Sequence, residues 1–400
     1  MVLRTAIFIP AAARTCNSKL DVMGRCSLAP VGPVLLLCNI FSGRPRNRGF
    51  PVTLCEGKSR NFQQMRGLAA RGYLVAVLSL SSCSPLQSAL APEGDTADAI
   101  AWLFWFFTIV CAVVWLIVMV LLWISLTRKR PDSPDPQLKP DRSRERRIGI
   151  VIAGGIGATV VILAVFTGAS FFSNKSFAEP RPHGLTIKIT GHQWWWQLNY
   201  EAHQADQTFE TANEIHIPAG QAVRLDFESP DVIHSFWVPN LAGKQDLIPG
   251  RFTELTIRAD KAGIYRGQCA EYCGIQHAHM AMYVVAQEPQ DYAAWRAQQL
   301  KPAVVPKSAE LRRGQQVFIS NACALCHTIG GTSAGGHVGP DLTHFGSRMT
   351  IAAGTARNSF GNLTGWIADP QHIKPYTRMP AVALSGPDLI AVSHYLESLK

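Results

Sequence analysis

The stretch "GQCAEYCGIQHAHMAM", Gly267–Met282, places two cysteines, two histidines and two methionines within sixteen residues. Thiolate, imidazole and thioether are soft ligands, which select copper over magnesium or calcium. A mononuclear blue-copper site needs only one cysteine, with two histidines and a methionine, so a second thiolate four residues away is surplus for one ion. Two thiolates can instead bridge two copper ions. The loop therefore predicts a dinuclear copper centre, with four ligands from one segment: Cys269, Cys273, His277 and Met280.

The residues around this loop predict an all-β domain. Short alternating runs at 186–190, 222–228, 253–259 and 280–286 read as strands, and turn signals such as Pro249-Gly250 separate them. In the run 222–228 apolar and charged residues alternate, as in a half-buried antiparallel strand. Several such strands within about 100 residues indicate a Greek-key sandwich or barrel. A distant copper ligand then comes from a neighbouring strand, and His234 in "SPDVIHSFWVPN" is the best candidate.

Two long apolar segments predict a transmembrane hairpin. Ile100–Leu126 has 27 residues and Ile148–Phe172 has 25, both without a charge. At 1.5 Å per residue each can cross a hydrocarbon core of ~30 Å. The connection between them, Thr127–Arg147, carries eight lysines and arginines. The positive-inside rule places this loop in the cytoplasm, and hence everything after Phe172 on the outer side.

Residues 65–83 resemble an export signal, although such signals normally stand at the very start of a chain. Residues 65–83 combine a basic start, a short apolar run and the lipoprotein-like box "LSSC", so we expect a mature chain that begins at a lipidated Cys83. Residues 1–64 are then either upstream sequence that is not part of the protein or a disordered extension. They carry nine basic and two acidic residues, whereas residues 173–400 carry nineteen of each. The net charge of +10 is therefore not the footprint of a nucleic-acid-binding surface.

A second motif, "CALCH" at Cys323–His327, has the spacing of a c-type haem attachment site. Two thiols add to the haem vinyl groups, and the adjacent His327 then binds the iron. A CxxC redox pair or a zinc pair is the alternative, but zinc would need a second pair of ligands and none follows. A methionine as sixth ligand would raise the haem potential. Met349 and Met379 both lie beyond the motif, and Met379, which precedes a proline, is favoured over Met349.

These motifs resemble known families. "CAEYCGIQHAHM" fits the Cys-x-Glu-x-Cys-x₃-His-x₂-Met signature of the CuA centre, and "GHQWWWQLNY" resembles the aromatic segment of cytochrome c oxidase subunit II. "SAELRRGQQVFISNACALCH" and "GPDLT" resemble a class I cytochrome c. The whole chain is similar to a caa3-type subunit II. The expected parts are a signal peptide (65–83), a two-helix anchor (84–172), a cupredoxin-like CuA domain (173–288), a linker with a short helix at 291–300 (289–306) and an all-α cytochrome c domain (307–400).

The resemblance also implies roles for individual residues. Cys269 and Cys273 would bridge the coppers, His234 and His277 would each bind one ion, and Met280 would be an axial ligand. Glu271 would offer its main-chain carbonyl to copper and its side chain to a magnesium ion shared with subunit I. Trp194 matches the residue where electrons enter, and Met379 matches the methionine ligand of the haem. His279 is an alternative to His277, but the x₃ spacing favours His277.

The implied function is that of subunit II of a haem–copper terminal oxidase in the bacterial cytoplasmic membrane. Electrons from cytochrome c or respiratory complex III would pass through haem c and CuA to haem a in subunit I. That subunit would reduce O₂ to water at haem a/CuB and pump protons. A quinol oxidase subunit II would lack the copper ligands. A stand-alone membrane-anchored electron carrier and a copper-delivery protein remain the alternatives.

Overall fold

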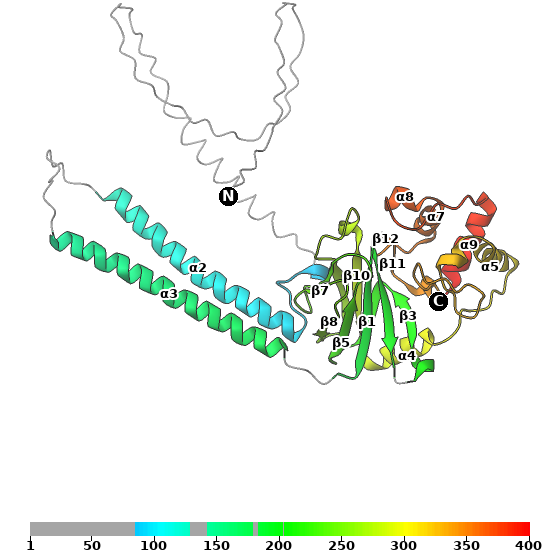
Figure 1. Cartoon of the computed structure of the whole chain (residues 1–400), viewed down its shortest axis with the longest axis horizontal. Helices are drawn as coiled ribbons and strands as arrows, with labels where there is room; N and C mark the ends of the chain where they lie inside the picture. The colour runs from blue at the N-terminus through cyan, green and yellow to red at the C-terminus, as the bar shows by residue number, and fades with distance from the viewer. Residues whose placement is uncertain (1–84, 129–141, 179–182, 203) are drawn as a thin grey trace, which may run out of the picture. The chain divides into compact units, whose positions relative to one another are not determined.

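Two long helices, a β-sandwich and a small helical domain follow one another along the chain (Figure 1). The computed structural model describes residues 85–128, 142–178, 183–202 and 204–400. All of them belong to one compact unit, Gly72–Lys400. The predicted signal peptide, Cys83 and residues 1–64 lie outside the described residues. The three architectures expected from the sequence are confirmed.

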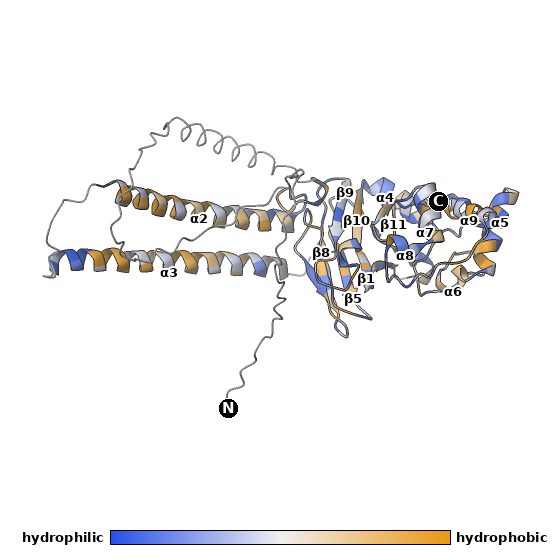
Figure 2. Ribbon diagram, turned by 90° about the horizontal axis from the view of Figure 1, so that it is seen from above, coloured by the Kyte–Doolittle hydropathy of each residue, from blue (hydrophilic) through white to orange (hydrophobic). Residues whose placement is uncertain are grey.

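The transmembrane hairpin consists of α2 (Asp95–Thr127) and α3 (Arg142–Ala178). Phe107 of α2 stacks on Phe166 of α3 with ring centroids 4.3 Å apart. α2 and the greater part of α3 are apolar, with their large side chains exposed, whereas the first residues of α3 are hydrophilic (Figure 2). α3 begins at Arg142, inside the segment predicted to be a loop. Arginine and glutamate are good helix formers, so the helix continues past its apolar part.

The sandwich has a five-stranded sheet in the order β3-β2-β1-β5-β8 and a three-stranded sheet in the order β4-β10-β9. The first sheet contains β1 (Leu185–His192), β2 (Trp195–Glu201), β3 (Phe209–Ala212), β5 (Val223–Glu228) and β8 (Thr253–Ile257). The second contains β4 (Glu214–Pro218), β9 (Gly263–Gln268) and β10 (Ala281–Gln287), and a separate ribbon pairs β6 (His234–Phe236) with β7 (Gln245–Leu247).

The four predicted strands are confirmed as β1, β5, β8 and β10. In β5 the alternation is reproduced: Val223, Leu225 and Phe227 are buried, and the charged residues between them are half-buried. The prediction that this strand is antiparallel is only half right, because β5 is antiparallel to β8 but parallel to β1. Alternation reports which face of a strand is buried and does not encode the direction of its neighbours.

Helix α4 (Pro289–Gln299) occupies the first part of the segment expected to be a linker. Proline at the first helical position suits a helix start, because its missing N–H would have no partner there. Trp295 of α4 stacks on His216 of β4 with ring centroids 4.0 Å apart. This part of the connection therefore packs on the sandwich.

The C-terminal domain is built from α5 (Ala309–Ser320), α6 (Cys323–Cys326), α7 (Phe360–Ala368), α8 (Pro370–Ile373) and α9 (Gly386–Ser398), with a β11–β12 hairpin (Thr350–Ile351 and Ala356–Arg357). The Ser385 hydroxyl caps α9 by accepting a hydrogen bond from the Asp388 N–H at 3.3 Å. α5 and α9 cross at Gly314. A side chain there would collide with the backbone of Ala391, so only glycine allows the crossing.

Candidate copper and haem sites

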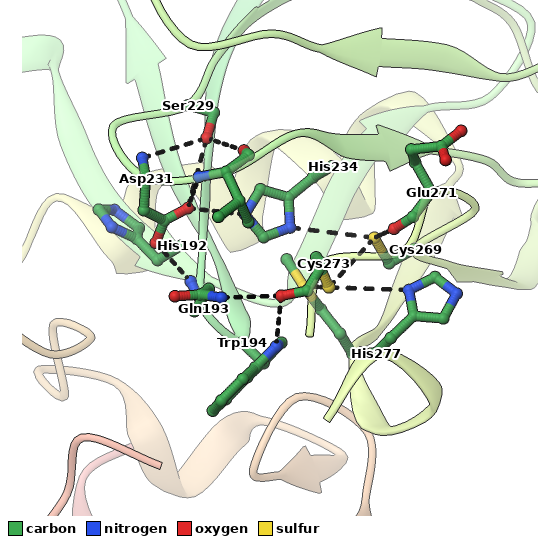
Figure 3. Close-up of polar contacts among 12 residues, drawn as sticks. His192, Gln193, Trp194, Ser229, Asp231, His234, Cys269, Glu271, Cys273 and His277 are labelled. Atoms are coloured by element: carbon green, nitrogen blue, oxygen red, sulfur yellow. Dashed lines mark hydrogen bonds and ion pairs between the residues drawn. The ribbon is translucent and has the colours of Figure 1, made fainter. Parts of the chain in front are cut away.

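The soft ligands come together where two β-elements end. Cys269 directly follows β9, and Cys273 lies in the loop that leads to the short turn η3 (His277–His279). Met280 ends this loop just before β10. His234 opens β6, and Figure 3 shows its ring facing the sulfurs of the loop. Backbone hydrogen bonds from the Gln268 N–H to the Trp237 carbonyl at 3.0 Å and from the Ala270 N–H to the Ser235 carbonyl at 2.9 Å bring the loop beside His234, although more than thirty residues separate them in the chain.

The distances divide the cluster into two halves. The Cys269 and Cys273 sulfurs lie 3.8 Å apart, well beyond the ~2.05 Å of a disulfide. His234 Nδ1 is 3.9 Å from the Cys269 sulfur, and His277 Nδ1 is 3.6 Å from the Cys273 sulfur. Met280 Sδ lies 3.8 Å from the Cys273 sulfur. Each sulfur therefore has its own imidazole, and the donor set fits two soft cations sharing two thiolates.

The two buried thiols affect each other's pKa in opposite directions. A hydrogen bond from Cys273 lowers the pKa of Cys269 to about 4, although burial opposes the shift. Interaction with Cys269 and burial raise the pKa of Cys273. Both side chains are 2% exposed, and a buried thiolate pair is costly without a compensating positive charge.

His279 and Glu271 turn their side chains away from the sulfurs. His279 Nδ1 lies 2.7 Å from Gln276 Oε1, so the structure brings His277 rather than His279 to the cluster. The Glu271 carbonyl oxygen lies 3.3 Å from the Cys269 sulfur. Its carboxylate points away from the Cys269 sulfur (Figure 3). It forms an ion pair with Lys244 Nζ at 3.4 Å.

Trp194 contacts the loop from the turn between β1 and β2. Its indole Nε1–H donates to the Cys273 carbonyl at 3.0 Å, and the Gln193 side chain donates to the same oxygen at 2.8 Å. Gly274 has φ +118°, and a side chain there would come within 3.0 Å of the Trp194 ring. The loop can therefore pack on Trp194 only with glycine next to Cys273.

A mainly apolar cavity in the helical domain holds the second motif. Its lining includes the four predicted haem-binding residues, Cys323, Cys326, His327 and Met379. His327 Nδ1–H donates to the Pro340 carbonyl at 2.7 Å, which leaves Nε2 to bind a metal. Burial lowers the pKa of His327, so the imidazole stays neutral, the form that binds iron.

Two polar atoms in the lining fit the carboxylates of a haem. Arg348 Nε and Thr350 Oγ1 are buried and have no hydrogen-bond partner among the described residues. A buried donor without a partner is costly, and a propionate group would satisfy both. Met349 lies outside the lining, and its N–H donates to Glu214 Oε1 at 2.6 Å.

Comparisons with known proteins agree with this geometry. Residues 202–287 match the family "Cytochrome C oxidase subunit II, periplasmic domain", and residues 311–400 match the cytochrome c family. Cytochrome c oxidase subunit 2 of Alkalihalophilus pseudofirmus is 36% identical over 320 residues, which cover 78% of this chain and 91% of that relative. The chain belongs to the cytochrome c oxidase subunit II family.

A second relative and a solved structure are also similar to this chain. The subunit 2 of Bacillus subtilis is 25% identical over 342 residues, covering 81% of this chain and 95% of that relative. The crystal structure of the periplasmic domain of subunit II of cytochrome oxidase from Bradyrhizobium japonicum is 33% identical, with a TM-score of 0.28. The matched region is 30% of the present chain and 95% of the chain in the Bradyrhizobium japonicum structure.

Membership of the subunit II family has direct consequences. It implies a CuA centre in the sandwich, and the cytochrome c domain implies haem c. It also implies association with subunit I of a haem–copper oxidase, in a membrane that α2 and α3 are long enough to cross. The enzyme is therefore cytochrome c oxidase.

The motifs did not reveal Asp231, which orients the predicted copper ligand His234. His234 Nε2–H donates to Asp231 Oδ1 at 2.9 Å, which turns Nδ1 toward the sulfurs. The Gln193 and Val232 N–H groups also donate to this carboxylate, at 2.8 and 2.7 Å. Burial favours the neutral acid, but these hydrogen bonds lower the pKa of Asp231 to about 2. A carboxylate three residues before a ligand histidine was the available signal.

We expect Asp231→Asn to weaken copper binding about 10- to 100-fold, the usual effect of removing the hydrogen-bond partner of a metal-binding histidine. An amide can still accept from His234, but it carries no charge to strengthen the imidazole as a ligand. Copper retention against a competing chelator measures the effect. Asp206→Asn, at an exposed position of the short turn η2 (Ala205–Gln207), is the control. Equal copper retention in the two variants would contradict the role of Asp231.

Proposed function

We propose that this chain receives electrons at a covalently attached haem c and passes them through a dinuclear CuA centre to haem a of subunit I. The proposal depends on one observation: the soft ligands form two sulfur–imidazole pairs, Cys269 with His234 and Cys273 with His277. Two sulfurs lie 3.8 Å apart, and each has a different imidazole within 4 Å. One copper would need only one of these sulfurs.

The proposed ligands follow from this arrangement. Cys269 and Cys273 would hold two copper ions between them, and His234 and His277 would each bind one of the ions. Met280 and the Glu271 carbonyl would be the weak ligands. Cys323 and Cys326 would hold the haem through thioether bonds, and His327 and Met379 would bind its iron. The exposed Glu271 carboxylate is available to a magnesium ion shared with subunit I.

When bound, the copper pair and the haem each supply a one-electron redox couple. The chain's own residues keep these groups dry and oriented. Asp231 fixes the tautomer of His234, and Pro340 fixes that of His327. Trp194 donates to the Cys273 carbonyl and also lines the haem cavity, so one side chain touches both sites. We propose Trp194 as the residue through which electrons reach CuA.

The rest of the proposal concerns the assembly. The basic loop lies in the cytoplasm and both redox domains lie on the outer side of a bacterial cytoplasmic membrane, behind a lipidated Cys83. Cytochrome c or respiratory complex III is the donor. O₂ reduction and proton pumping reside in subunit I. A copper-delivery role fits less well, because His234 is fully buried and a delivery site must release its ion.

Expression of the full chain with copper and haem maturation tests the proposal. We expect two copper ions per chain with a mixed-valence EPR spectrum, and one haem c with a Met–iron charge-transfer band. Co-purification with subunit I separates an oxidase subunit from a stand-alone carrier. A single copper with an ordinary four-line spectrum would refute the dinuclear centre.

A further inference from the structure

A buried lysine joins the haem domain to the copper domain. Lys374 follows α8 and is 2% exposed. Its ammonium donates to the carbonyls of Trp194 at 2.7 Å, His279 at 2.7 Å and Ala352 at 3.0 Å. Trp194 and His279 belong to the sandwich, whereas Ala352 belongs to the cytochrome c domain. Burial lowers the pKa of Lys374 to about 7, and the three carbonyls match the three N–H groups of its protonated form, two of them across the domain boundary.

This arrangement makes the hydrogen bonds of Lys374 depend on domain contact. A buried ammonium is costly unless its donors are satisfied. Separation of the domains would remove two of the three acceptors. Lys374 therefore stabilises the contact between the two domains, because its side chain keeps all its hydrogen bonds only when the carbonyls of Trp194 and His279 are within reach.

The same short helix also holds the haem-ligand loop. Gln371 of α8 donates to the carbonyls of Thr377 at 2.8 Å and Met379 at 2.9 Å, and accepts from the Tyr376 N–H at 2.9 Å. The Lys374 N–H closes α8 on the Pro370 carbonyl at 2.8 Å. α8 is thus tied to the Met379 loop on one side and to the turn that contains His277 on the other.

Further contacts close the boundary around Trp194. Glu214 of the sandwich accepts from the N–H groups of Met349 at 2.6 Å and Thr350 at 3.1 Å. The Ala281 N–H donates to the Ala353 carbonyl at 3.0 Å. Trp194 is only 8% exposed, and its ring lines the haem cavity. A soluble protein therefore has no open face of Trp194 on which to dock.

We propose that Lys374 is a positioning residue that keeps the haem domain docked over Trp194, so that electrons from outside reach CuA only by way of the haem. This inference rests on the proposed function, because it assumes that haem and CuA are both present. It adds the residue that holds the two domains together: Lys374 donates to carbonyls of both domains beside Trp194.

Chemical modification of the assembled oxidase tests the docking directly. We expect an amine-reactive reagent, followed by peptide mass spectrometry, to modify the exposed Lys307 of the same domain and to leave Lys374 unmodified. Modification of Lys374 at the rate of Lys307 would overturn the proposal. If Lys374 is modified and the enzyme does not contain both the copper pair and haem c, the proposed function fails as well. If Lys374 is modified and both groups are present, only the docking proposal fails.

The matched variants Lys374→Met and Lys307→Met test the consequence. Methionine keeps an apolar stem but cannot donate to the three carbonyls. Pulsed photoreduction measures the rate of electron transfer from haem to CuA. We expect this rate to fall about tenfold in Lys374→Met, because the loss of one hydrogen bond from a charged group changes an equilibrium by about this factor. Direct reduction of CuA by soluble cytochrome c should appear. The Met–iron band and copper EPR spectrum should stay unchanged, as should all properties of Lys307→Met.

An unchanged transfer rate in Lys374→Met, with no direct reduction of CuA, would overturn the positioning role. Direct reduction of CuA in the unsubstituted enzyme before its haem would overturn the single route. If Lys374→Met does not assemble, the modification experiment on the unsubstituted enzyme decides.

Discussion

Cys273→Ser binds at most one copper ion per chain and loses the mixed-valence EPR signal. A serine hydroxyl is a harder and far less acidic ligand than a thiol, so it cannot bridge two coppers in the same way. Cys273 also lies within 4 Å of Cys269, His277 and Met280, so its loss affects three neighbours at once. We expect electron transfer to subunit I to fall about 100-fold or more, at least the loss that follows removal of a ligand's hydrogen-bond partner.

The control for this variant is Cys111→Ser, which removes an isolated, exposed cysteine of α2. Its copper content and spectrum should match the unsubstituted protein. Haem attachment at Cys323 and Cys326 should persist in both variants, and the donor should still reduce the haem. Two coppers and an unchanged spectrum in Cys273→Ser would show that the loop does not form a shared thiolate bridge.

Met379→Ala abolishes the Met–iron charge-transfer band and lowers the haem potential. Met379 lines the cavity that also holds His327, whereas Met349 lies outside it. Loss of a thioether ligand should lower the potential by on the order of 0.1 V, within the ~0.8 V range over which axial ligands tune haem. Visible absorption and a redox titration measure both effects.

Met349→Ala is the matched control, because it removes the competing methionine and keeps the backbone N–H that donates to Glu214. The band should remain in this variant. A band that is lost in Met349→Ala and kept in Met379→Ala would reverse the assignment.

Local patterns sufficed wherever the interacting groups are close in the chain. Cys269, Cys273, His277 and Met280 lie within twelve residues, and the CxxCH motif lies within five. Their spacing alone therefore indicated copper and haem chemistry. Hydrophobicity indicated α2 and α3 for a similar reason, since a membrane span is a property of one continuous segment. The ends of α3 were less predictable, because charged residues can extend a helix beyond its apolar part.

Groups that meet across the fold could not be found in this way. Lys374 lies 180 residues from Trp194, and in the sequence it is one lysine among many. Its role depends on burial and on three carbonyls, and a backbone carbonyl carries no mark in the sequence. The proline after Met379 favoured this methionine in the sequence. Only the fold shows that Met379 lines the haem cavity, whereas the Met349 N–H donates to Glu214 outside it.

The sequence by itself therefore determined the chemistry of this protein, because soft ligands, thiol spacing and apolar length are properties of short segments. The tertiary structure alone decided how the two redox sites face each other. That arrangement depends on long-range contacts such as those of Lys374 and Glu214, in which buried polar groups must find partners from other parts of the chain.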